Sequence, residues 1–136
     1  MAIHSWNLQK ALYSRLNGGS ITDENDDAIT GVFDDVPEGT AYPYVVMGEE
    51  TATNIGVKDK DMHEYTQTIH VWSQYRGLRD VKEIMEQIYT LLNDYSITVS
   101  GASAITLRHE FQTVLLEDDG ITRHGIMRFR VVVSDN

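Results

Sequence analysis

The chain has 136 residues, 41% of them hydrophobic and 24% charged, so its composition excludes a disordered chain and its length favours one domain over residues 1–136. It has no cysteine, no apolar run near the ~20 residues that cross a bilayer and no secretion signal at residues 1–6, so we expect no disulfides and no membrane association. Twenty-one acidic against eleven basic residues give a net charge of −10, which disfavours nucleic-acid binding.

The N-terminal part of the chain predicts a helix followed by an acidic stretch with little regular structure. Three leucines recur at four-residue spacing before an Asn-Gly-Gly sequence of the kind that ends helices, which predicts a helix over residues 5–17. These leucines are Leu8, Leu12 and Leu16. Residues 20–39 carry seven acids and no base, and we expect a loop with one short strand there.

The middle of the chain predicts two strands, a long loop between them and a regular helix. A rigid turn that contains two prolines leads into a strand over residues 44–47. Residues 48–61 are polar and aperiodic, and they are too many for a common hairpin loop, so we expect a functional, mobile loop. Alternating β-prone residues predict a strand over residues 65–73, and apolar residues at three- and four-residue spacing predict a helix over residues 78–94.

The C-terminal part predicts a short strand over residues 97–99 and a long β-hairpin. Apolar and polar residues alternate over residues 104–117 and again over 121–133, on either side of an Asp-Asp-Gly turn. The first alternation assigns Ile105, Leu107, Phe111 and Leu115 to one face. Arms of about 13 residues span roughly 44 Å, so part of the hairpin is expected to project toward a neighbouring molecule.

These elements predict an α+β fold. Two helices would pack on one face of an antiparallel, or mixed, sheet of about five strands, and the chain would end in the long hairpin. The other face of the sheet would carry arginines.

No motif for catalysis, metal binding or cofactor binding is found, so we expect a protein that is not an enzyme and that holds neither a metal nor a cofactor. The five histidines lack metal-ligand spacing, and we interpret His70 and His124 as polar-face strand residues and His109 as a core residue. The run at residues 23–27 resembles a calcium loop only briefly, because Ala28 stands where that loop needs a glycine.

One concentration of basic residues occurs on the two arms of the predicted hairpin, at Arg108, Arg123, Arg128 and Arg130. Two interpretations are open. The arginines could pair across strands with Glu110 and nearby acids, for about 0.2–1 kcal/mol per pair. They could instead form a subunit interface by meeting the acidic segment of another copy, for which the candidates are Asp23, Asp26, Asp27, Asp34 and Asp35.

The order of motifs resembles the tail-completion, or tail-terminator, family of long-tailed bacteriophages. The resemblance rests on the organisation of nearly the whole chain. The matching pieces are the leucine helix near the N-terminus, the turn at residues 36–39 with the strand at 42–46, the strand end at 70–73, the helix at 78–92 and the closing segment at 120–131.

The resemblance implies a non-enzymatic structural protein of the virion, located at the tail–neck junction and assembled in the host cytoplasm. It would form a homohexameric ring that caps the tail tube and joins the tail to the head–neck connector. Its partners would be further copies of itself, the tail tube protein and the connector or head-closure protein, and DNA would pass through the ring without specific binding. The isolated subunit could be a monomer in solution.

The loop at residues 48–61 is the candidate for docking on the tube or neck, through Thr51, Asn54, Val57, Lys58, Asp59 and Lys60. Two alternative functions remain. The first is another neck component, such as a head-closure or adaptor protein. The second is a small ligand-binding domain or enzyme, which would be marked by a deep apolar pocket with a perturbed histidine or carboxylate.

Overall fold

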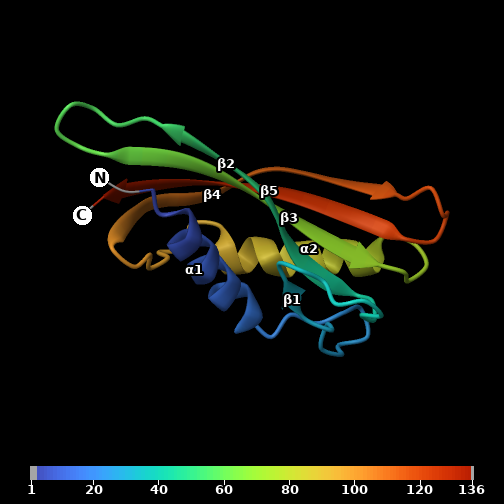
Figure 1. Cartoon of the computed structure of the whole chain (residues 1–136). Coiled ribbons are helices and arrows are strands. Elements are labelled where there is room, and N and C mark those ends of the chain that lie inside the picture. The colour runs from blue at the N-terminus through green and yellow to red at the C-terminus, as the bar shows by residue number, and fades with distance from the viewer. Residues whose placement is uncertain (1–2, 136) are drawn as a thin grey trace.

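The computed structural model describes residues 3–135 and has one layer of helices on one layer of sheet (Figure 1). The five strands lie in the order β1-β2-β3-β5-β4, and all neighbouring pairs are antiparallel except β1 and β2. The predicted α+β fold with a mixed sheet and a C-terminal hairpin is therefore confirmed. Of the domain predicted over residues 1–136, positions 1, 2 and 136 lie outside the described residues. The elements are α1 (Ser5–Asn17), β1 (Val32–Phe33), β2 (Tyr44–Asn54), β3 (Met62–Ser73), α2 (Arg79–Leu92), β4 (Ala102–Leu116) and β5 (Arg123–Asp135).

The core lies between the helices and one face of the sheet. The three leucines of α1 are buried, and α2 buries the apolar stripe that its spacing predicts. Alternate residues of the central strands meet these helices, among them Ile69 and Val71 on β3 and Met127 and Phe129 on β5. Gly125 allows α2 to approach the sheet closely, because a Cβ atom there would lie 2.5 Å from the sulfur of Met85. None of the described helices is long and apolar enough to span a membrane.

The predicted loop over residues 48–61 is wrong in its first half. Strand β2 continues to Asn54 and pairs with β3 from Glu50↔Gln67 to Asn54↔His63, and only residues 55–61 connect the two strands. Residues 51–54 are exposed on both faces, so they show no alternation of apolar and polar residues. The expected docking segment is therefore a β-hairpin rather than an irregular loop.

The predicted strand over residues 97–99 is also wrong. Ile97 and Val99 are buried in the core, but this segment pairs with no strand in the described chain. It runs beside α1, where the Asn7 side chain donates a hydrogen bond to the Ser100 carbonyl oxygen at 3.1 Å. Two buried β-branched residues close together in the sequence predict a strand, whether or not a neighbouring strand is present to pair with it.

Two irregularities in β4 overturn the predicted alternation. The pairing register with β5 shifts between Ala104 and Thr106 and again between His109 and Phe111. Each extra residue moves the following side chains to the opposite face of the sheet. Leu107 is buried against the helices as predicted, but Ile105, Phe111 and Leu115 are exposed.

The start of α2 is held by a buried carboxylate. Asp80 is 0% exposed, and its two oxygens accept hydrogen bonds from the Ser73 hydroxyl at 2.5 Å and from the Glu24 backbone N–H at 2.9 Å. An acidic side chain in the first turn of a helix also faces the positive end of the helix dipole. Asp80 therefore ties the acidic loop, the end of β3 and α2 together.

Candidate assembly surfaces

The face of the sheet opposite the helices, here called the open face, is not covered by any element of the described chain (Figure 1). It carries the strand residues that alternate with the buried core positions. The register places Trp72 of β3 opposite His124 of β5, which is itself opposite Leu115 of β4. Further residues of the open face are Val46, His70, Phe111, Ile126, Arg128 and Arg130.

The four arginines of the hairpin have different surroundings. Arg130 forms an ion pair with Glu64 of β3 at 2.5 Å and lowers the pKa of that carboxyl group. The cross-strand interpretation therefore holds for Arg130, although its partner is not Glu110. Arg108 lies 3.3 Å from Asp94, and Arg123 donates a hydrogen bond to the Ile121 carbonyl oxygen.

Arg128 differs from the other three arginines because its guanidinium lies over the ring of Phe111, 5.3 Å from the ring centroid. It forms no ion pair with any residue between positions 3 and 135. Its charge instead contributes to lowering the pKa of Glu49, after the larger effect of the His70 hydrogen bond.

The acidic candidates also separate into two groups. Asp23 is only 6% exposed, and its carboxylate accepts hydrogen bonds from the backbone N–H groups of Asn25 and Asp27. Its carboxylate therefore shapes its own loop. The remaining candidates, Asp26, Asp27, Asp34 and Asp35, are exposed. Within the described chain, none of them forms an ion pair with the hairpin arginines.

The residues predicted to dock on the tube or neck lie together on one projecting hairpin. We call residues 50–66 the β2–β3 arm; its base contacts α1 and the core through Glu50 and Tyr65, and its distal part extends beyond the helical layer at the end of the sheet opposite the β4–β5 turn (Figure 1). At its tip, Val57 and Lys60 exchange two backbone hydrogen bonds of 3.0 and 3.1 Å, so Lys58 and Asp59 form the turn. Val57 is 72% exposed, and Thr51 and Asn54 lie in the strand below the tip.

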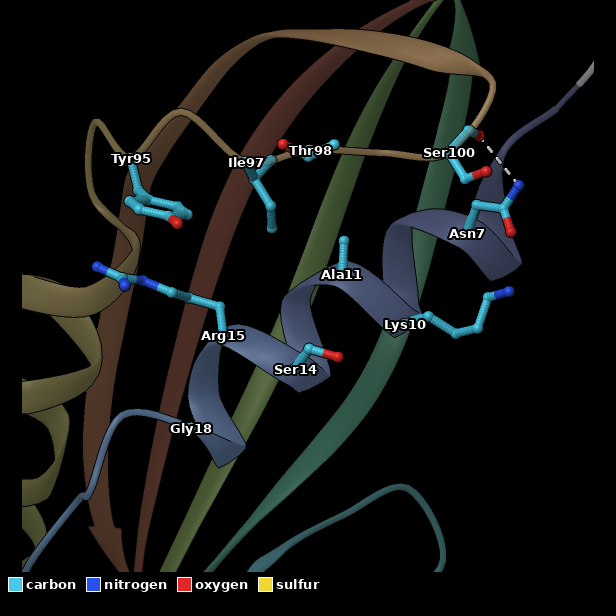
Figure 2. Close-up of a pocket in the computed structure, with 10 residues that line it drawn as sticks. All are labelled: Asn7, Lys10, Ala11, Ser14, Arg15, Gly18, Tyr95, Ile97, Thr98 and Ser100. Atoms are coloured by element: carbon cyan, nitrogen blue, oxygen red, sulfur yellow. Dashed lines mark hydrogen bonds between the residues drawn. The ribbon is translucent and has the colours of Figure 1, made fainter.

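A groove of about 610 Å³ lies between α1 and residues 95–100, as Figure 2 shows. Lys10 and Arg15, the only basic residues before Lys58, both line it. The Arg15 guanidinium lies over the Tyr95 ring at 3.7 Å, and its Nε donates a hydrogen bond to the Leu91 carbonyl oxygen. The residues that line the groove include no histidine or carboxylate, so the groove lacks the expected mark of a catalytic or ligand-binding pocket.

Four titratable side chains that sequence reasoning did not connect form a row across the open face. We call Glu49, His70, His124 and Glu117 the histidine cluster. His70 contacts Glu49 at 2.7 Å and His124 at 2.6 Å, and His124 contacts Glu117 at 2.7 Å. The hydrogen bond from His70 lowers the pKa of Glu49. Burial is the main cause that lowers the pKa of His124.

His70 and His124 do lie on the face away from the helices, as predicted, but His124 is only 8% exposed and is not a solvated polar residue. Glu49, His70 and the Glu117–His124 pair come from three separate parts of the sequence, so only the strand register reveals the cluster. His109 packs against Tyr89 and Phe129, but it is half-buried and its ring contacts the Gln112 side chain at the surface, so it lies at the edge of the core and not within it.

The projecting arms, the open face and the separated charged groups are typical of a protein that functions through contacts at its surface. Residues 10–134 match the family described as Tail completion protein gp17, so the chain belongs to the family of tail completion proteins. It is 25% identical over 95 residues to Tail completion protein gp17 of Bacillus phage SPP1, which is 70% of each chain. A chain from the virion of a native gene transfer agent particle has the same fold, with a TM-score of 0.83, 20% identity and coverage of 98% of this chain and 99% of that one.

The predicted resemblance is confirmed by this family membership. Members of the family are structural components of phage tails, so the predicted virion localisation and a structural role in the tail are confirmed as well.

Proposed function

We propose that the protein assembles into a closed ring of identical subunits, a hexamer, that caps the end of the tail tube at the tail–neck junction and joins the tail to the head–neck connector. The observation that carries the proposal is the position of the two turns. The tip of the β2–β3 arm and the β4–β5 turn lie at opposite ends of the sheet. Subunits with projecting hairpins at both ends suit a ring held between two partners, with the β2–β3 arm docking on the tube or neck.

Charge supports a lateral contact between subunits of such a ring. A ring uses two different patches of each subunit, one meeting the other on the next copy. Arg128 supplies positive charge on the open face, and the exposed acids Asp26, Asp27, Asp34 and Asp35 supply negative charge elsewhere on the subunit. Such a complementary pair favours the correct neighbour and orientation. A subunit that is monomeric in solution could then assemble on its template.

The net charge of −10 supports passage of DNA through the ring without specific binding, because acidic surfaces repel phosphates. Mixing the purified chain with its tail tube protein tests the proposed function, with light scattering and negative-stain imaging as the measurements. Rings on tube ends and arrested lengthening are expected. Binding to DNA-filled capsids and not to tubes would instead identify a head-closure or adaptor protein.

Replacing Arg128 with glutamate is expected to weaken ring assembly at least about tenfold, since it puts a negative charge against the acidic patch of the next subunit. Arg130 is a poorer choice, because reversing its charge would set two carboxylates against each other within one chain. The measurement is the concentration at which rings form on tube ends.

The matched control for Arg128→Glu is Arg76→Glu, which makes the same charge change at an exposed position away from the open face. Urea unfolding of both variants establishes that the subunit is folded. Equal assembly of the Arg128→Glu variant and the parent chain would remove Arg128 from the interface.

A further inference from the structure

The contacts of the histidine cluster fix how many protons it needs. Three contacts join the four side chains in a row: Glu49 Oε1 to His70 Nε2, His70 Nδ1 to His124 Nε2, and His124 Nδ1 to Glu117 Oε1. An ionised carboxylate only accepts hydrogen bonds, so His70 Nε2 and His124 Nδ1 must each carry a hydrogen. The contact between the two rings requires a third. Two neutral imidazoles carry two hydrogens in total, so the row is complete only when the pair bears one extra proton.

The surrounding groups favour one positive charge on the pair and oppose a second. The charged groups that face it are Glu49 of β2, Glu117 beyond the end of β4 and Arg128 of β5, while the helices lie on the other side of the sheet. Trp72 of β3 stacks on His124 with ring centroids 3.7 Å apart and planes at 11°, a geometry that stabilises an imidazolium. A second proton would place two hydrogen-bond donors against each other 2.6 Å apart.

The backbone holds the rings in this arrangement. The pairing register of β2 shifts between Met47 and Glu50, in the segment that carries Glu49. Gly48 lies under the His70 ring, where a Cβ atom would come within 2.5 Å of a ring carbon. The arrangement of the four side chains therefore also depends on Gly48 and on the register shift in β2.

We propose that His70 and His124 share a single proton and, with Glu49 and Glu117, form a clamp across four strands that is complete only over a limited range of pH. Glu117 directly precedes the turn of the C-terminal hairpin, so the clamp fastens the base of that hairpin through β5 and β3 to β2. The inference is independent of the proposed ring.

The clamp gives a folded state whose stability passes through a maximum with pH. Below the maximum, the folded chain resists the second proton that two unfolded histidines accept, so stability falls as the pH falls. The lowered pKa of His124 has this sign. Above the maximum, loss of the shared proton leaves one of the three contacts without a hydrogen, so the row is incomplete and stability falls as the pH rises.

Nitrogen-15 NMR of the imidazole rings across pH 4–9, on the full chain, tests the proton count directly. The nitrogens of His70 and His124 are expected to titrate in two steps more than about one pH unit apart, with one proton in each step. His63, which lies outside the cluster on the β2–β3 arm, is the internal reference. A single step shared by both rings and coinciding with that of His63 would overturn the proposal.

Variants provide a second readout. In a Trp6→Phe background, Trp72 is the only tryptophan, and its emission reports the charge of the stacked His124 ring. Emission should change in the same two steps as the NMR signals. The His124→Gln variant should lose the stability maximum, whereas the matched His63→Gln variant should keep it. Retention of the maximum in a folded His124→Gln chain would also overturn the clamp, and the NMR titration decides the question if that variant does not fold.

Discussion

Replacing Asp80 with alanine is expected to lower the free energy of unfolding by about 3–5 kcal/mol. The side chain is fully buried, and its removal would leave the Ser73 hydroxyl and the Glu24 backbone N–H without their acceptor. Each buried donor left without a partner costs about 1–3 kcal/mol, and hydrogen bonds to a charged group are the stronger ones. Urea unfolding followed by circular dichroism is the measurement.

The matched control for Asp80→Ala is Glu86→Ala, which removes an exposed carboxylate from the same helix and should change stability by no more than about 0.5 kcal/mol. Ser73→Ala should cause a smaller loss than Asp80→Ala, and the double variant should lose less than the sum of the two, because the residues share one hydrogen bond. A loss below about 1 kcal/mol in the Asp80→Ala variant would show that the loop and helix are held by other contacts.

Shortening the β2–β3 arm is expected to leave the subunit folded and to abolish joining of tails to heads. The register allows residues 57–60 to be replaced by Asn-Gly, which favours a tight turn between Gly56 and Asp61. Asp61 is kept because its carbonyl oxygen accepts a hydrogen bond from the Asp135 backbone N–H at 2.9 Å. Unfolding free energy should change little, since the replaced residues are exposed.

The measurement for the shortened arm is the yield of complete virions when a phage lacking its own copy is complemented with the variant. A Lys58→Ser, Lys60→Ser variant separates the loss of charge from the loss of length. Normal yield from the shortened arm would exclude the tip as a docking element. Accumulation of separate tails and filled heads would support that role.

The spacing of residues along the sequence was sufficient to predict the helices and the C-terminal hairpin. Leu8, Leu12 and Leu16 lie on one side of α1 because four-residue spacing follows the helical turn, and burial of that side made the prediction correct. The Asp-Asp-Gly turn placed the two arms of the hairpin opposite each other, since a tight turn sets the pairing of the strands that follow it.

The wrong predictions concern segments in which the spacing of apolar and polar residues does not indicate the structure. The distal part of β2 has no buried face, so nothing in its residues distinguishes a strand from a loop. Ile97 and Val99 are buried without strand neighbours. The alternation of apolar residues indicates that they are buried, but it does not indicate whether they pair with another strand. The bulges in β4 reversed the faces of Phe111 and Leu115, because one extra residue in a strand exchanges the sides of all that follow.

By itself, then, the sequence determined the class of fold, the acidic character and the tail completion family, because these depend on composition, spacing and the order of motifs. Only the tertiary structure decided which side chains meet. Arg130 with Glu64 and the row from Glu49 to Glu117 depend on strand register, and Asp80 with the Glu24 backbone N–H depends on the close approach of segments far apart in the chain. Such contacts produce no periodic pattern in the sequence, because the partners are brought together by the fold and not by their spacing along the chain.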